Sequence, residues 1–128
     1  MAAEEYKEKV YQFEKLDVWQ QARLLVVDVY RLIKRFPQEE RYAMCDQLRR
    51  AVISIPSNIA EGMGRISVKE TAHFLEIAYG SLMEVYCQLQ VSVDLGYLSE
   101  EEFQQIKPQI NSISRLLNGL HRAKMNQK

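Results

Sequence analysis

The sequence predicts an all-α protein whose four long helices form an antiparallel, up-down-up-down bundle. Apolar residues recur every three or four positions along four segments, and glycine or proline residues separate these segments. The sequence lacks period-two alternation of β-branched residues and Asn-Gly hairpin signals. The 128 residues suffice for one domain with a real core, and four helices joined by short turns pack naturally as a bundle.

The first helix is expected to begin near Asp17, a good N-cap residue, and to end before Pro37. Residues 1–15 are charge-rich and weakly periodic, which predicts a flexible or loosely docked arm. The arm's candidate anchors are Val10, Tyr11 and Phe13. The bundle itself is expected to span residues 16–121.

The second helix is expected from about Glu39 to Glu61, with Gly62 and Gly64 supplying a C-cap and a tight turn. Pro56 lies inside this segment, where proline removes one backbone hydrogen bond and clashes with the preceding turn. The apolar residues keep their phase across Pro56. We therefore expect a kinked but continuous helix, and a complete break at Pro56 is the alternative.

The third helix is expected from Ser67, which has capping-box spacing to Glu70, to about Leu95, because Gly96 is a natural C′ residue. Its apolar residues cover well over half of the circumference, whereas a helix in a monomeric bundle needs an apolar arc of only about 100°. The surplus predicts a second partner surface, hence a homo-oligomer with Leu82 at the subunit interface. The apolar residues are Phe74, Ile77, Ala78 and Val85 on one side and Leu75, Leu82, Tyr86, Leu89 and Val93 on the next.

The fourth helix opens with a second capping box, Ser99 and Glu102, and with three acidic residues that suit the positive end of the helix dipole. Pro108 is expected to bend its early turns. Residues 122–128 are expected to form a polar, basic tail. Apolar residues spaced alternately by three and four positions indicate close helix packing: Phe103, Ile106, Ile110, Ile113, Leu117 and Leu120.

The amino-acid composition argues against several classes of function and location. The 17 basic and 17 acidic residues balance, whereas proteins that coat nucleic acid usually show a basic excess. The two cysteines, Cys45 and Cys87, are far apart and are expected to be reduced structural thiols. The charged N-terminus does not read as a signal peptide, and no apolar run approaches the roughly 20 residues of a membrane span. We expect a cytoplasmic protein without a membrane partner.

A polar stripe lies beside the apolar stripe of the second helix. It mixes short amide and hydroxyl groups with an arginine and a glutamate, which suits a partly buried, hydrogen-bonded seam between helices or subunits. The stripe consists of Gln47, Arg50, Ser54, Asn58 and Glu61, and Ser81 and Glu84 of the third helix are expected to join it. The alternative is a ligand or RNA site built from the second-helix residues.

Basic residues cluster on two helix faces. Arg23, Arg31 and Lys34 share a face of the first helix; Arg115 and Arg122 share a face of the fourth, with Lys124 beyond. A solvated surface is the simpler interpretation. The alternative is a strip that contacts the phosphates of RNA or DNA, and repetition of the strip around a ring would multiply its avidity.

Motifs for catalysis and metal binding are incomplete. Glu70-x-x-His73 has the spacing of di-iron bundles, but the other histidine, His121, has Asn118 three positions before it instead of glutamate. Neither histidine lies in a nucleophile motif, and Gly62-Met63-Gly64 lacks the lysine and spacing of a phosphate loop. We therefore expect no catalytic residues, no metal and no cofactor, and the chain is not predicted to be an enzyme.

Short motifs occur in a familiar order. They are FEKLDVW (13–19), FP (36–37), QLRRA (47–51), SNIAEG (57–62), GSLME (80–84) and LGYL (95–98). From about Phe13 to Leu120 the chain resembles the 23S rRNA intervening-sequence proteins. The resemblance implies a four-helix bundle assembled into a ring, typically a homopentamer. The chain is also similar to accessory proteins of diversity-generating retroelements, which implies contact with nucleic acid and a reverse transcriptase.

Two functions follow from the sequence. The first is a non-enzymatic, homo-oligomeric scaffold that binds nucleic acid or a nucleic-acid-processing partner. The second is a purely structural or protein-binding oligomer without a nucleic-acid role.

Overall fold

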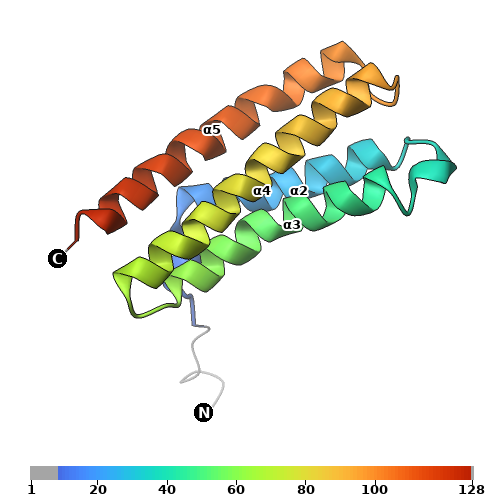
Figure 1. Cartoon of the computed structure of the whole chain (residues 1–128). Helices are drawn as coiled ribbons and strands as arrows, with labels where there is room; N and C mark the ends of the chain where they lie inside the picture. Colours follow the sequence, from blue (N-terminus) through green and yellow to red (C-terminus); the bar gives the residue numbers. More distant parts are fainter. Residues whose placement is uncertain (1–8, 128) are drawn as a thin grey trace, which may run out of the picture.

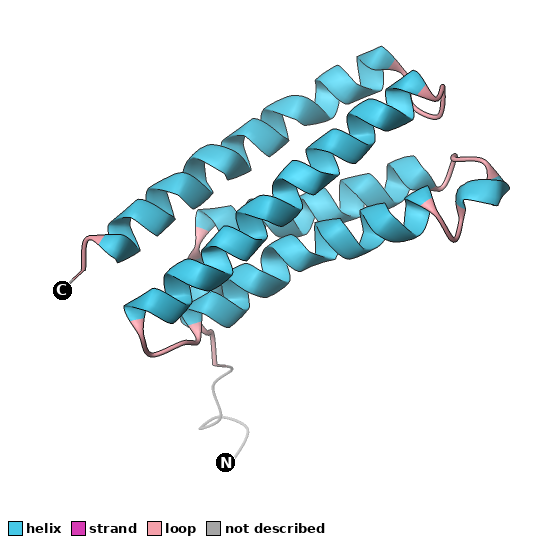
Figure 2. Cartoon of the chain, in the orientation of Figure 1, coloured by secondary structure: helices cyan, strands magenta, loops and turns pink. Residues whose placement is uncertain are grey.

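The computed structural model describes residues 9–127, and every regular element in this part of the chain is a helix. Four α-helices lie side by side as a bundle (Figure 1). They are α2 (Asp17–Ile33), α3 (Met44–Met63), α4 (Val68–Asp94) and α5 (Glu100–Met125). Two 3-10 helices, η1 (Gln12–Lys15) and η2 (Gln38–Glu40), precede α2 and α3, and short loops join the helices (Figure 2). The prediction of an all-α chain with four long helices is confirmed.

The helices meet through a single apolar core. α3 packs against α4, α4 against α5, and α2 against both α3 and α5. Among the described residues the backbones of α2 and α4 do not come close to each other, so these two helices occupy diagonal corners of the bundle. The largest fully buried side chains come from all four helices: Leu25, Leu48, Ile55, Ile59, Leu75, Leu82, Leu89, Ile110, Ile113 and Leu117.

Leu82 is completely buried in this core, so its predicted place at a subunit interface was wrong. Leu75, Ala78, Val85 and Leu89 are also buried within the chain, because α4 packs against α3 and α5 at once. The prediction assumed that a helix in a monomeric bundle buries one apolar stripe of about 100°. Two neighbouring helices bury a wider part of the surface of α4. The apolar surface left on α4 is narrower and includes Ile77, Val91 and Leu95, which are 38%, 39% and 53% exposed.

The segment before α2 is held by an aromatic contact and by a hydrogen bond from the side-chain amide of Gln20 to the carbonyl of Glu14 at 2.7 Å. The ring of Phe13 in η1 meets Trp19 edge-on, with 5.0 Å between the ring centroids. Val10 and Tyr11 are more than half exposed, so Phe13 alone of the three expected anchors packs on the bundle. Residue 16 is the N-cap of α2, one position before the predicted Asp17, and its leucine side chain makes no capping bond. Residues 1–8 of the predicted arm lie outside the described residues.

α3 begins later than predicted and ends differently. The chain from Pro37 first forms η2 and a turn, and the α-helix starts only at Met44. It then runs through Pro56 without a break. Gly62 lies inside the helix, where an added Cβ would come within 3.0 Å of the Cβ of Phe74. The absence of a side chain at Gly62 therefore allows α4 to approach α3 closely, and Gly64 is the C-cap residue instead.

The two ends of the α4–α5 connection follow the predicted capping chemistry. Gly96 has φ = 81°, and the amides of Gly96 and Tyr97 donate to the carbonyls of Val93 (3.0 Å) and Ser92 (2.9 Å), which is a Schellman motif. The Ser99–Glu102 capping box is complete, with bonds of 3.0 and 3.1 Å. α5 continues through Pro108 to Met125, so the expected tail is helical over most of its length.

The capping box predicted at the start of α4 forms only in part. The hydroxyl of Ser67 accepts a hydrogen bond from the Glu70 amide at 3.0 Å. The carboxylate of Glu70 does not return to Ser67 but lies 3.8 Å from the guanidinium of Arg65. The neighbouring arginine therefore competes for the group that would close the box.

Candidate functional site

The predicted polar stripe lies along the junction of α3 and α4. The hydroxyl of Ser81 on α4 donates to the hydroxyl of Ser54 on α3 at 2.8 Å. The Asn58 side-chain amide donates to the carbonyl and the hydroxyl of Ser54, each at 2.8 Å. These three side chains are half-buried, so the bonds tie the two helices together where water has limited access.

A second set of bonds lies further along the same junction and centres on Gln88 of α4. Its side-chain amide donates to the amide oxygen of Gln47 on α3 at 3.0 Å and to the carboxylate of Glu84 at 3.2 Å. The oxygen of the Gln88 side chain is buried and has no partner among the described residues. The sequence reasoning missed Gln88, although its position four residues after Glu84 and seven after Ser81 places it on the same helix face.

Arg50 and Glu61 of the predicted stripe do not enter these bonds. Glu61 pairs with Arg65 four residues later, and Arg50 is exposed. Arg50 lines a shallow groove of about 440 Å³ between α3 and α4, together with Gln47, Ala51, Ser54, Ser81 and Glu84. Most residues of the predicted stripe therefore take part in hydrogen bonds along the junction of α3 and α4, and several of them also line an open polar groove beside Arg50.

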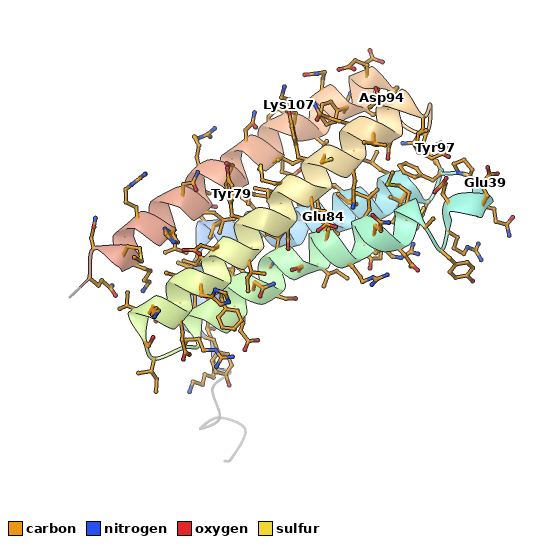
Figure 3. All side chains as sticks on the ribbon, viewed as in Figure 1. Glu39, Tyr79, Glu84, Asp94, Tyr97 and Lys107 are labelled. Atoms are coloured by element: carbon orange, nitrogen blue, oxygen red, sulfur yellow. The ribbon has the colours of Figure 1, made fainter. Side chains whose placement is uncertain are left out.

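The outer face of α4 has a composition that the sequence analysis did not recognise. Residues 70–94, which make up all but the first two positions of α4, contain four acidic residues and no lysine or arginine. The exposed positions of α4 therefore combine carboxylates with apolar side chains. Figure 3 shows Glu84 and Asp94 on this helix, and the exposed apolar residues are Ile77, Met83, Val91 and Leu95. A simple count of charges along the chain would have found this region.

The outer face of α2 combines apolar side chains with the opposite charge. Leu24 and Val27 are 56% and 43% exposed, and Arg23, Arg31 and Lys34 are exposed beside them on this helix. Arg31 lies 3.6 Å from Asp28, and the guanidinium of Arg23 stacks over the Trp19 ring at 5.0 Å. Only Lys34 of the three predicted cations is free of such local contacts within residues 9–127.

The predicted cations of α5 do not form one strip. Arg115 and Arg122 are seven residues apart, exposed, and on the same side of the helix. Lys124 follows Arg115 by nine residues, or two and a half turns, and is half-buried on the opposite side. Residues 103–128 contain five basic and no acidic residues, so Arg115 and Arg122 lie in a locally basic region of a neutral chain. No bond brings these cations together with those of α2.

The histidines have structural contacts in the described chain. His121 of α5 lies 2.8 Å from the carboxylate of Glu76 on α4 and joins the two helices near the end of the bundle. His73 is exposed and meets the ring of Phe74 edge-on. Residues 9–127 contain no group of three or more histidine, cysteine, aspartate or glutamate side chains that could hold a metal ion.

The two cysteines differ in their surroundings. Cys45 is buried beneath the connection between α2 and α3, whereas Cys87 is exposed on the outer face of α4. Burial raises the pKa of the Cys45 thiol, which keeps this residue protonated and unreactive.

None of the helices in the described part of the chain has both the length and the hydrophobicity needed to cross a bilayer.

Comparison with known proteins places these observations in a family. The model of the 23S rRNA-intervening sequence protein family matches residues 14–119. The chain belongs to this family. The sequence-based resemblance to the 23S rRNA intervening-sequence proteins is thereby confirmed.

A solved structure similar to this family member comes from Bacteroides thetaiotaomicron. That protein is described as a member of the S23 ribosomal protein family with unknown function. The two chains share 21% sequence identity and superpose with a TM-score of 0.71, over 81% of this chain and 97% of the other. At this level of identity the similarity supports the fold alone. No curated protein matches the chain.

Proposed function

We propose that this member of the 23S rRNA-intervening sequence family is a non-enzymatic scaffold. Its antiparallel, up-down-up-down bundle assembles with copies of itself into a ring, for which the resemblance favours a homopentamer in the cytoplasm. The observation that carries the proposal is the outer face of α4, where apolar side chains lie among carboxylates and no lysine or arginine follows Lys69. Such a face is complementary to a surface that is both apolar and basic.

The outer face of α2 has this composition. Leu24 and Val27 offer apolar surface, and Arg31 adds positive charge beside them. Because α2 and α4 occupy diagonal corners of the bundle, one copy can present its α2 face to the α4 face of the next. Pairing of two α4 faces would instead bring carboxylates together, which opposes association. The charge pattern therefore favours a head-to-tail contact, the kind that closes into a ring when its rotation closes.

The assembly is tested with variants that block one face each. Val91→Glu places a carboxylate on the α4 face, and Leu24→Glu places one on the α2 face. Both side chains are partly exposed, so the variants should retain their helical circular dichroism. Asn111→Glu, at an exposed position of α5, is the control. We expect light scattering to show wild-type mass for the control and monomers for each face variant alone.

Mixing the two face variants tests the head-to-tail arrangement. The intact α2 face of Val91→Glu can pair with the intact α4 face of Leu24→Glu, so the mixture should form a 1:1 dimer that grows no further. An interface between two α4 faces predicts that Leu24→Glu dimerises on its own and that mixing adds nothing. A wild-type chain that remains monomeric at every accessible concentration would refute the proposal.

We further propose that the ring contacts nucleic acid through Arg115 and Arg122. These arginines are exposed on one side of α5, in a region without acidic residues, and neither has an ion-pair partner within residues 9–127. Each copy in a ring would repeat the pair, so weak contacts to phosphates would add up to useful avidity. A purely structural or protein-binding oligomer remains the alternative function.

Salt dependence separates the two functions. Each phosphate contact contributes a slope of about 0.7 to 0.9 to the fall of log affinity with log salt concentration. The double variant Arg115→Gln, Arg122→Gln should bind RNA or DNA more weakly and with a shallower slope, while Lys69→Gln on α4 should behave as wild type. If the assembled wild-type protein binds no nucleic acid at about 50 mM salt, the structural alternative holds.

A further inference from the structure

A cavity at one end of the bundle is not used by the proposed assembly. It has a volume of about 420 Å³ and lies where the connection between α2 and α3 folds over the bundle. This volume falls within the range of about 300–1,000 Å³ that is typical of small-molecule sites. The lining residues are Tyr30, Ile33, Lys34, Phe36, Pro37, Gln38, Arg41, Cys45 and Arg49.

The wall of the cavity is divided into an apolar floor and a cationic rim. Ile33, Phe36 and Cys45 form part of the floor and are at most 7% exposed. Lys34 and Arg41 are exposed at the rim, and neither has an ion-pair partner among the described residues. The cavity can therefore accept an apolar body and a negative charge at the same time.

Arg49 is the third cation of the rim and is held in place by two bonds. One terminal nitrogen of its guanidinium donates to the carbonyl of Arg41 at 2.9 Å and to the carboxylate of Asp46 at 2.7 Å. The Asp46 bond raises the pKa of Arg49 further, so its charge is permanent. These bonds use only part of the five N–H donors of a guanidinium, and the others remain for a ligand. A cation fixed in this way binds an anion without first losing side-chain freedom.

The nearby carboxylates offset only part of the positive charge of this rim. Asp46 is bonded to Arg49. Glu40 accepts hydrogen bonds from the hydroxyl of Tyr97 at 2.7 Å and from the amide of Met44 at 3.2 Å, which hold its carboxylate away from the rim cations but leave its negative charge in place. Glu39 lies on the exposed side of η2 and does not line the cavity (Figure 3). Three cations thus surround the cavity, with one carboxylate bonded directly to them.

We propose that this cavity binds a small organic anion, a carboxylate or phosphate group carried on an apolar body. The charged group lies between Lys34, Arg41 and Arg49, and the apolar body rests on the floor formed by Ile33 and Phe36. A concave site with a buried floor suits a small molecule better than a polymer, because nucleic acid would reach the rim cations but leave the floor unused. The site shares Lys34 with the outer face of α2, but Leu24, Val27 and Arg31, on which the assembly proposal depends, do not line the cavity.

The probes are phenyl phosphate, benzoate and the uncharged benzyl alcohol, added to the full-length isotope-labelled protein. We expect phenyl phosphate or benzoate to shift the amide signals of Ile33, Phe36 and Cys45 with a dissociation constant on the order of 1 mM. The stronger of the two anions identifies the preferred charged group. Benzyl alcohol should bind at least tenfold more weakly, because it offers no charge to the rim.

Substitutions of the rim cations test whether these residues bind the anion. Arg41→Gln and Lys34→Gln should each weaken anion binding by about tenfold, the effect of losing one charge-assisted hydrogen bond. Lys15→Gln, an exposed lysine of η1, is the control and should bind as wild type. Both rim residues are exposed, so unchanged circular dichroism will show that the variants fold.

Three results would overturn the proposal. They are an absence of shifts with both anions at about tenfold the expected dissociation constant, equal binding of benzyl alcohol, or undiminished binding by the double variant Lys34→Gln, Arg41→Gln. A single-stranded oligonucleotide that binds in an Arg41-dependent manner, while both small anions fail, would assign these cations to nucleic acid instead. The mass of the assembly is measured in parallel, so a failure of the scaffold proposal is recognised separately.

Discussion

α4 and α5 are neighbours of almost equal length, 27 and 26 residues, but their surfaces carry opposite charge. The helix α4 contains no basic residue after Lys69, and α5 contains no acidic residue after Glu102. Their inner faces are alike, because both contribute leucine or isoleucine side chains to the same core. The two helices therefore share one structural role and differ in what they offer to a partner.

This difference changes the meaning of the net charge. A formal charge of zero argued against nucleic-acid binding when the chain was treated as a whole. Within this total, the four carboxylates of α4 offset the basic side chains that follow Glu102 in α5. Electrostatic attraction acts over about 10 Å at moderate salt, so a partner responds to the nearest face and not to the total. An acidic α4 face can meet a second copy while a basic α5 face meets phosphates.

The largest expected effect comes from the shared inner faces. Leu82→Ala in α4 and Leu117→Ala in α5 should each lower the free energy of unfolding by about 2–5 kcal/mol, because both remove fully buried methyl groups from a closed core. Urea denaturation followed by circular dichroism measures the loss. Gln90→Ala on the exposed side of α4 is the control and should change stability by less than about 0.5 kcal/mol. A control as costly as Leu82→Ala would mean that inner and outer faces are not distinct.

Glycine substitutions at the α3–α4 contact and in α5 should change the free energy of unfolding in opposite directions. Gly62→Ala places a Cβ 3.0 Å from the Cβ of Phe74 on α4, and backbone must move to relieve the contact, so a loss of about 1–3 kcal/mol is expected. Gly119→Ala in α5 meets nothing within 4 Å and should add about 0.4–1 kcal/mol, because alanine restricts the unfolded chain and favours the helix. Thermal unfolding of both variants tests this. A stabilising Gly62→Ala would show that α3 and α4 can separate freely.

The sequence predicts the local features of this fold better than its contacts. The four helices, the Ser99–Glu102 box and the Gly96 C-cap follow from short-range patterns that can be recognised within a single segment of the sequence. The burial of Leu82 depends on two neighbouring helices at once, and the role of Gly62 depends on how closely α4 approaches. Neither can be read from one helix alone. The bonds of Ser54, Ser81 and Asn58 were foreseen in kind, but Gln88 entered from outside the predicted set.

The N-termini of α4 and α5 should differ in their sensitivity to the loss of the capping serine. Ser67→Ala removes one hydrogen bond, to the amide of Glu70, whereas Ser99→Ala removes one from a reciprocal pair with Glu102. Each change should cost about 0.5–2 kcal/mol, with Ser99→Ala in the upper part of this range. Urea midpoints of the two variants, each compared with Ser112→Ala inside α5, measure the difference. Equal costs would mean that the return bond from Glu102 adds nothing.

The smallest effect is a pH dependence at the start of α5. The backbone amide of Ser99, and next the guanidinium of Arg35, hold the pKa of Glu102 below its ordinary value. A carboxyl whose pKa is lower in the folded state stabilises the fold fully above its unfolded pKa, and this contribution is lost as pH falls through the folded pKa. The loss should therefore appear below about pH 4.3, the ordinary value for glutamate.

Substitutions at Glu102 and Arg35 assign this pH dependence. Glu102→Gln should flatten the fall of the urea midpoint between about pH 6 and pH 3, and Arg35→Gln should flatten it less, because the Ser99 amide remains. Glu101→Gln, one residue earlier and exposed, is the matched control. An acid slope that is the same in Glu102→Gln and in Glu101→Gln would place the acid sensitivity elsewhere, with the many carboxylates of α4 as the next group to test. The contribution is small because Arg35 is exposed to solvent, where screening weakens an ion pair.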